Sequence, residues 1–405
     1  MTEEEVGEKA KRSLLNGVRI VLVSLMLLPI VLCRLFLIFS KKPFYDFMTY
    51  WASGRLFLTG KDPYSASAVY VMENSLGYHG ELQTMLNPPW TLPMVSVLGV
   101  GPFSLMHLVW FVVVLILETL SVLMLWHYFG GARKQSWIAL AVLGTYFPAA
   151  IAEQVGQITP LMLFGLAVFL WMERRGQYRI ASAGLFLLSL KPHLVWLVAL
   201  AVFLWAIQIR KYYLIFVPCL LCLTFTLFSL WVNPSVWGYF HQTTQAAIES
   251  RCGLAFILGP EVSRSYPGLR FLPMLIGLVW FAWIWQKYRA CWRWEEQIPL
   301  LLLVSIGTAP YYWPHDYVIA LPAMVAVAVK ASRCLRQWHL VFVCWFLCQI
   351  TMLGVNQFTR LMLTVVAVKW IIYWVLSMYL LADHCVVGIG LPVEETSCNH
   401  PQPEL

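Results

Sequence analysis

The stretch VRIVLVSLMLLPIVLCRLFLIF, residues 18–39, is an apolar run long enough to cross a bilayer as one helix, and SKKPFYDFMTYWASGR, residues 40–55, follows it directly. Asp46 therefore lies a few residues beyond the end of a predicted membrane helix, where the bilayer gives way to water. A carboxylate held there by aromatic neighbours can take a proton from a polar substrate. We expect the functional site to be built around Asp46.

The composition places the chain among membrane proteins. Its 405 residues are 60% hydrophobic and 12% charged, and its mean hydropathy is +0.70, whereas soluble domains carry about 25% charged residues. We expect residues 1–405 to form one integral-membrane domain without a separate soluble module. The net charge of +8 does not predict a nucleic-acid partner, because the basic residues lie between apolar runs, where they determine topology.

The apolar runs predict an all-α fold, a polytopic bundle of about twelve transmembrane helices. Several runs are short for a helix exposed to lipid, so we expect them to be buried in the bundle or extended by flanking polar residues. The expected spans are 18–39, 104–127, 136–151, 157–173, 179–190, 193–209, 212–232, 271–288, 297–311, 316–330, 337–354 and 360–381.

Lys and Arg gather in alternate short connections, which places residues 1–17 and 382–405 in the cytoplasm. Two long segments, 40–103 and 233–270, then become outer loops. The first contains an apolar piece between Pro88 and Pro102 that is too short to span, and we interpret it as a half-helix or re-entrant segment. Such backbone is tolerated at membrane depth only against protein or a water-filled cavity, so this piece predicts a cavity. In the second loop we expect a short helix after Asn233.

The polar residues at membrane depth concentrate at the outer ends of the predicted spans. Asp46, Gln157, Lys191 and His315 all belong to this set, whereas the inner ends carry mainly Lys and Arg. Ionisable residues within membrane segments usually face the interior of the bundle or an aqueous cavity. The distribution therefore favours one polar cavity that opens at the outer face.

Each of these residues has an alternative structural interpretation. Lys191 precedes Pro192, so its ammonium could bind a phosphate, satisfy the carbonyls that the proline leaves free, or extend to the surface. Gln157 could cap the following helix or bond a sugar hydroxyl. Tyr64 could stack on a sugar ring, although packing against neighbouring helices explains it equally well.

The segment Tyr311-Tyr312-Trp313-Pro314-His315-Asp316 is rich in aromatic residues and ends in two ionisable groups. An interfacial aromatic belt is the simplest interpretation of its first half. Paired ionisable groups in an outer turn beside a proline exceed what such a belt requires. We therefore favour a role in the site for His315.

These segments, taken in order, resemble glycosyltransferase family 87, whose members are GT-C-type polytopic enzymes similar to mycobacterial polyprenyl-phosphomannose-dependent phosphatidylinositol-mannoside mannosyltransferases. The resemblance is carried by the first outer loop, by a Pro-Pro segment and by three later motifs, over about residues 40–330. The matching segments are Asp46-Phe47, Tyr50 to Arg55, Gly60 to Tyr64, Asn87 to Trp90 with Pro102, Gly156-Gln157, Lys191-Pro192, and Pro310 to His315. One departure is that Asp316 follows His315, where the family often has a second histidine.

The resemblance implies an inverting transferase of the GT-C type that moves a hexose, with mannose the expected sugar, from a polyprenyl-phosphate donor to a glycolipid or glycan acceptor. Asp46 matches the family's catalytic aspartate, and Lys191 and His315 match positions near the donor phosphate. Gln157, Arg55 and Tyr64 complete the expected substrate-binding set. No metal or other cofactor is implied, and the enzyme is expected in the inner (plasma) membrane, in contact with its lipids, with its site on the extracytoplasmic side.

A lipid or lipid-linked sugar flippase is the main alternative, because it could use the same outer-facing cavity and charges as a translocation path. Transporters commonly show internal repeats and polar residues near the membrane midplane. The chain shows neither halves with matching patterns nor polar residues spread across the membrane. The sequence therefore favours the transferase.

Overall fold

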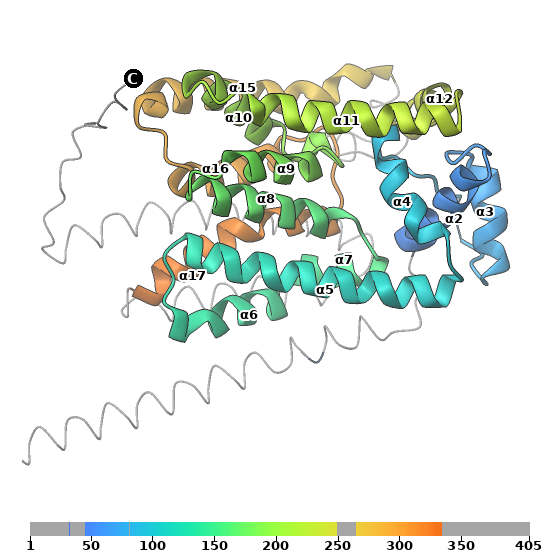
Figure 1. Cartoon of the computed structure of the whole chain (residues 1–405), viewed down its shortest axis with the longest axis horizontal. Coiled ribbons are helices and arrows are strands. Elements are labelled where there is room, and N and C mark those ends of the chain that lie inside the picture. The colour runs from blue at the N-terminus through green and yellow to red at the C-terminus, as the bar shows by residue number, and fades with distance from the viewer. Residues whose placement is uncertain (1–31, 33–44, 81, 249–264, 334–405) are drawn as a thin grey trace, which may run out of the picture.

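The computed structural model describes Leu32 and residues 45–80, 82–248 and 265–333, and every regular element within these ranges is a helix. Figure 1 shows long helices lying roughly side by side, with a smaller group of short helices at one end of the bundle. This group consists of α2 (Tyr45–Leu58), α3 (Ala66–Ser75) and α4 (Leu92–Gly99). The all-α prediction is confirmed for this part of the chain.

Four helices in the described ranges are long and apolar enough to cross a membrane, so the chain is a helical membrane protein. They are α5 (Phe103–Tyr128), α11 (Tyr213–Val232), the helical segment Gly268–Cys291 containing α15 (Leu272–Tyr288), and the segment Pro314–Arg333. The pair α6 (Ser136–Thr145) and α7 (Phe147–Val155) would add a fifth, although it is bent by 61°.

The remaining helices of the bundle are apolar but shorter. They are α8 (Thr159–Glu173), α9 (Tyr178–Leu188), α10 (Trp196–Gln208) and α16 (Trp294–Gly307), whereas α17 (Leu321–Arg333) belongs to the segment Pro314–Arg333 already named. A helix lies at each expected span between residues 104 and 330, but the total of twelve crossings is not established. The expected spans 337–354 and 360–381, the tail 382–405 and the segment 1–17 lie outside the described residues, as does all of 18–39 except Leu32.

Helix α8 is a short helix that is buried within the bundle, one of the two arrangements expected for the short apolar runs. On α8, Met162, Leu163 and Leu166 are buried against neighbouring helices. On α11, by contrast, Phe216 and Trp231 are largely exposed, as expected for a helix that faces lipid. Central helices thus need not match the bilayer thickness, because other helices cover their ends.

Helix breaks concentrate at one end of the bundle. Helix α7 ends at Gly156, the 3-10 turn η3 (Pro192–Leu194) separates α9 from α10, and the 3-10 segment η6 (Pro314–Ala320) precedes α17. Each break occurs beside a glycine or proline, residues that end a helix or pre-set its first turn. The breaks release polar side chains and backbone groups next to α2.

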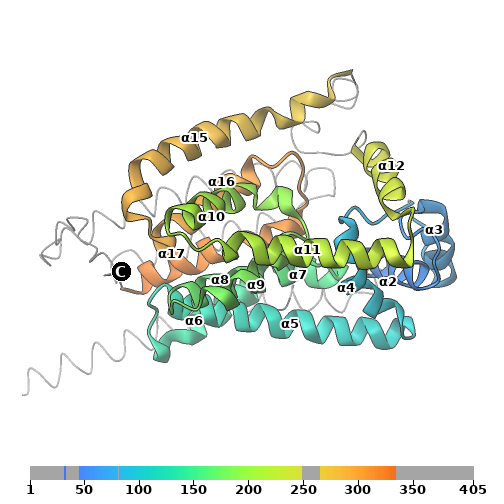
Figure 2. The ribbon, with the colours of Figure 1, turned by 45° about the horizontal axis from the view of Figure 1, so that its top comes forward.

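The two outer-loop predictions agree with the helices that form there. Within the piece between Pro88 and Pro102, the 3-10 turn η1 (Pro89–Thr91) leads into the short α4, which packs along α2. After Asn233 the chain forms α12 (Val236–Ile248), which lies at the same end of the bundle as α2 and α3 (Figures 1 and 2). The Asn233 amide donates to the carbonyls of Gly60 and Lys61 and so fastens the two segments together.

Candidate functional site

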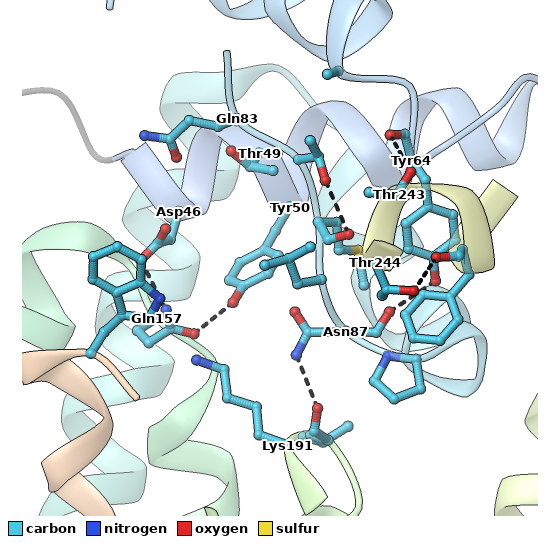
Figure 3. Close-up of a pocket in the computed structure, with 18 of the residues that line it drawn as sticks. Asp46, Thr49, Tyr50, Tyr64, Gln83, Asn87, Gln157, Lys191, Thr243 and Thr244 are labelled. Atoms are coloured by element: carbon cyan, nitrogen blue, oxygen red, sulfur yellow. Dashed lines mark hydrogen bonds between the residues drawn. The ribbon is translucent and has the colours of Figure 1, made fainter. Parts of the chain in front are cut away.

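Five of the six predicted site residues line one cavity of about 840 Å³ at this end of the bundle. Asp46 comes from α2, Gln157 from the α7–α8 break, Lys191 from the α9–α10 break and His315 from η6, and Tyr64 precedes α3. Figure 3 shows Asp46, Gln157 and Lys191 close together on one side of Tyr50. Residues separated by more than a hundred positions therefore share one polar space.

Asp46 lies in the first turn of α2 with its side chain 26% exposed. The positive end of the helix dipole favours a negative charge at this position. Its Oδ2 accepts a hydrogen bond from Nε2 of Gln157 at 2.8 Å. The carboxylate is thus held from one side and remains open to the cavity.

Gln157 is the centre of the hydrogen-bond network around Asp46. Its Oε1 accepts from the Tyr50 hydroxyl at 2.6 Å and from the backbone N–H of Ile158 at 2.9 Å. Because a backbone N–H can only donate, the amide oxygen must face Ile158, and Nε2 must face Asp46 and His315. All four hydrogen-bonding positions of the amide are then used within the protein, which favours the helix-end interpretation over contact with a sugar.

Gly156 allows Gln157 to reach this position. Its φ of +72° is the left-handed conformation that ends α7, and glycine adopts it without steric cost. A Cβ at this residue would lie 2.5 Å from Cβ of Phe47, the neighbour of Asp46. The carbonyl of Gly156 also accepts from Nε1 of Trp110 at 2.9 Å. The helix end and α2 therefore meet at a contact that excludes any side chain.

Lys191 forms an ion pair with Asp316, with 2.7 Å between Nζ and Oδ1. Asp316 is 1% exposed and also accepts from the Thr159 hydroxyl at 3.2 Å and from the backbone N–H of Trp313 at 2.9 Å. This buried carboxylate is therefore fully engaged. The ammonium of Lys191 keeps further donors that can point into the cavity, since a lysine carries three.

His315 lies between the two carboxylates. Its Nε2 is 3.0 Å from Nε2 of Gln157, and because the amide nitrogen donates, the ring nitrogen accepts. The proton of a neutral imidazole then resides on Nδ1, which is 3.9 Å from Oδ2 of Asp46. That separation exceeds a hydrogen bond, so the ring N–H is available to another oxygen in the cavity.

The structure places Tyr64 and Arg55 in different surroundings from those four residues. The Tyr64 hydroxyl donates to the carbonyl of Asn87 at 2.9 Å, and its buried ring packs 5.4 Å from that of Phe240, which favours the packing interpretation. Arg55 is exposed and lies over the Trp51 ring at 5.1 Å, away from the cavity lining. The structure therefore does not bring Arg55 to the predicted site.

Sequence reasoning missed two polar residues behind and within the cavity. Glu73 on α3 is buried and accepts from the Thr49 hydroxyl at 2.7 Å, one turn along α2 from Asp46. Burial, with a smaller contribution from the nearby Asp46 charge, raises the pKa of Glu73 to about 7. Asn87 donates from Nδ2 to the Leu190 carbonyl at 3.0 Å. Glu73 lies in no recognisable motif, and although Asn87 begins the Pro-Pro segment, its contact depends on how the loop packs.

The described lining residues carry three carboxylates, Asp46, Asp62 and Asp316, and one ammonium, Lys191. Lys191 is paired with Asp316, and Asp46 has no such ion pair with a lysine or arginine among the described residues. No three His, Cys, Asp or Glu side chains in the described part of the chain are arranged to hold a metal ion.

No protein-family model, curated protein or solved structure matches this chain. The resemblance to glycosyltransferase family 87 therefore rests on the residues of the chain itself and remains a prediction.

Proposed function

We propose that this protein is a membrane hexosyltransferase of the GT-C type, which moves a sugar from a polyprenyl-phosphate donor to an extracytoplasmic glycolipid or glycan. The observation that supports it best is the position of Asp46. This carboxylate opens into a cavity of about 840 Å³ and is fixed by Gln157, while the one lysine that lines the cavity is paired with Asp316.

In the proposed reaction, Asp46 takes the proton from an acceptor hydroxyl while the acceptor oxygen attacks the anomeric carbon of the donor. The bond between that carbon and the phosphate oxygen breaks, and polyprenyl phosphate leaves with the electron pair. Attack opposite the leaving group inverts the anomeric centre. General base catalysis of this kind contributes about 10²–10⁴-fold.

The departing phosphate needs hydrogen-bond donors as its negative charge develops. Lys191 supplies its remaining N–H groups, and Asp316 holds the ammonium in place at 2.7 Å. The Nδ1–H of His315 supplies a second donor. In this scheme the reaction requires no metal ion, because the protein's own donors neutralise the leaving group.

The cavity also fits the proposed location. It lies at the end of the bundle where the predicted outer loops meet, and Lys and Arg of the short connections lie toward the other end. We therefore assign the cavity to the extracytoplasmic side of the inner (plasma) membrane. A donor used on that side must be carried by a lipid, and we propose that α4 and the helices near it receive its isoprenoid tail.

The test is transfer of radiolabelled mannose from polyprenyl-phosphomannose by the purified protein in lipid nanodiscs, with and without a membrane-lipid extract as acceptor. We expect transfer that depends on the extract and is lost in Asp46→Asn. The matched control is Asp62→Asn, since Asp62 lines the same cavity and its side-chain oxygen only needs to accept from the N–H of Tyr64.

Equal turnover by Asp46→Asn and wild type would refute the role of Asp46. Absence of transfer with every polyprenyl-phosphate sugar, combined with movement of labelled lipid across the bilayer, would establish the flippase instead.

A further inference from the structure

The cavity continues beyond the charged residues toward α12. There it is lined by Gln242, Thr243 and Thr244 of α12 and by Asn87 of the first loop, a set that we call the α12 end. Figure 3 shows Thr243 and Thr244 on the opposite side of the cavity from Asp46 and Gln157. The two ends thus differ in chemistry, one ionic and the other neutral and polar.

Asn87 provides the clearest sign of a ligand at the α12 end. The residue is 4% exposed, and its Nδ2 donates to the carbonyl of Leu190, which fixes the amide orientation. In the described part of the chain nothing donates to Oδ1 of Asn87. Figure 3 shows this amide pointing into the space between Tyr50 and Lys191. Because Asn87 lines the cavity, its Oδ1 is an acceptor to which a ligand or water there can donate a hydrogen bond.

The charges at this end select the kind of ligand. Lys191 is the only Lys or Arg among the described residues that line the cavity, and it is paired with Asp316. Asp62, next to Tyr64, adds a carboxylate whose pKa is raised by burial. An anionic ligand would meet one carboxylate and no cation at the α12 end, whereas hydroxyl groups would find acceptors on Asn87 and Gln242.

We propose that the α12 end is a binding subsite for a neutral saccharide, the sugar portion of the acceptor. Its assignment to the acceptor rests on the transfer reaction proposed above, in which Lys191 and His315 hold the donor phosphate and Asp46 takes the proton from the acceptor hydroxyl. The volume agrees, because about 840 Å³ is near the upper part of the range for small-molecule sites and can hold two sugar units in line. The aromatic ring of Phe240, packed beside Tyr64, gives one wall of the subsite an apolar surface.

The subsite is tested by measuring direct binding of sugar probes to the full-length chain in nanodiscs, with saturation-transfer NMR as the detection method. The probes are mannobiose, which is neutral, and mannobiose 6-phosphate, which is its anionic match. We expect the neutral probe to bind more tightly. Thr244→Val should weaken binding about two- to tenfold, the effect of one hydrogen bond.

A second variant reverses the charge preference. Gln242→Lys adds a cation to the α12 end at an exposed residue, so the protein should still fold, and the phosphorylated probe should gain affinity relative to mannobiose. Gln177→Lys makes the same change at an exposed residue between α8 and α9, outside the cavity, and should leave both affinities unchanged.

The subsite is refuted if wild type binds the phosphorylated probe more tightly than mannobiose or fails to bind mannobiose. It is also refuted if Thr244→Val and Gln242→Lys bind mannobiose as tightly as wild type does. A different result is expected if the subsite is correct and the proposed transfer reaction is wrong. Mannobiose would then bind, and its binding would respond to the Thr244→Val and Gln242→Lys changes as expected, but no acceptor would receive sugar from the donor.

Discussion

Two carboxylates of the same cavity, Asp46 and Asp316, have opposite environments. Asp46 is 26% exposed and is held by the neutral amide of Gln157, whereas Asp316 is 1% exposed and is held by Lys191, Thr159 and a backbone N–H. A carboxylate whose oxygens are all engaged cannot accept a substrate proton without losing those contacts. Asp46 is therefore assigned to proton transfer, and Asp316 to structural support of the site.

The largest expected effect is on turnover in the Asp46 region. Asp46→Asn should lower kcat about 10²–10⁴-fold while leaving the unfolding midpoint close to that of wild type, because the amide keeps the shape and one contact with Gln157. Turnover in nanodiscs and thermal unfolding in detergent measure the two quantities. A large fall in the midpoint would assign the residue a structural role.

In the Asp316 region the large effect is expected on stability. Asp316→Asn leaves the ammonium of Lys191 buried without its counterion, which should cost about 3–5 kcal/mol of stability. Lys191→Met combined with Asp316→Asn should recover most of that stability, as thermal unfolding of the single and double variants would show. If the double variant also recovered full turnover, Lys191 would serve only the ion pair and not the donor phosphate.

Gln157 connects the two regions, and its variant tests how it acts. Gln157→Glu keeps the acceptor for Tyr50 and Ile158 but places a second carboxylate against Asp46. We expect kcat to fall about tenfold to a hundredfold through misplacement of the base, with an unchanged KM for the acceptor. A rise in KM alone would indicate that the amide binds a sugar hydroxyl. Gln83→Glu, in the same cavity, is the matched control.

Glu73 predicts a smaller effect that depends on pH. Because its pKa is raised to about 7, the folded protein binds more protons than the unfolded chain between pH 4.5, its ordinary pKa, and 7. Stability therefore falls as pH rises through that window and stays lower above it. Glu73→Gln should unfold like wild type at pH 5 and be more stable at pH 8, by about 1–2 kcal/mol after allowance for solvent screening. An equal change at both pH values would contradict this account.

The smallest effect is expected at Arg55. Its guanidinium lies over the Trp51 ring in an exposed position, where such contacts contribute about 0.5–1 kcal/mol. Arg55→Gln should keep donor and acceptor KM within about twofold of wild type, because the side chain is outside the cavity. A selective rise in the donor KM would restore Arg55 to the substrate-binding set.

Membrane topology explains why part of the site could be predicted. Residues at the same ends of membrane helices lie at the same depth, so Asp46, Gln157, Lys191 and His315 could be grouped before any contact was known. Depth does not give lateral position, however. The pairing of Lys191 with Asp316 and the distance of Arg55 from the cavity both depend on which helices are neighbours.

Other features were hidden for a related reason. Hydropathy detects apolar helices but not what covers them, so it could not distinguish the exposed α11 from the buried α8, and the number of crossings could not be fixed. Glu73 gave no signal because a single glutamate in a polar loop is ordinary. Its burial results from the packing of α3 on α2.

Gly156 has a consequence for mutational tolerance. It contributes no functional group, yet a Cβ there would overlap Phe47, and its backbone requires a positive φ. Any replacement would push the helix end away from α2 and separate Gln157 from Asp46. In a saturation library selected for activity, this position should accept as few residues as Asp46 does. Intolerance in such a library would therefore mark the residues that bring functional groups together as well as those that carry them.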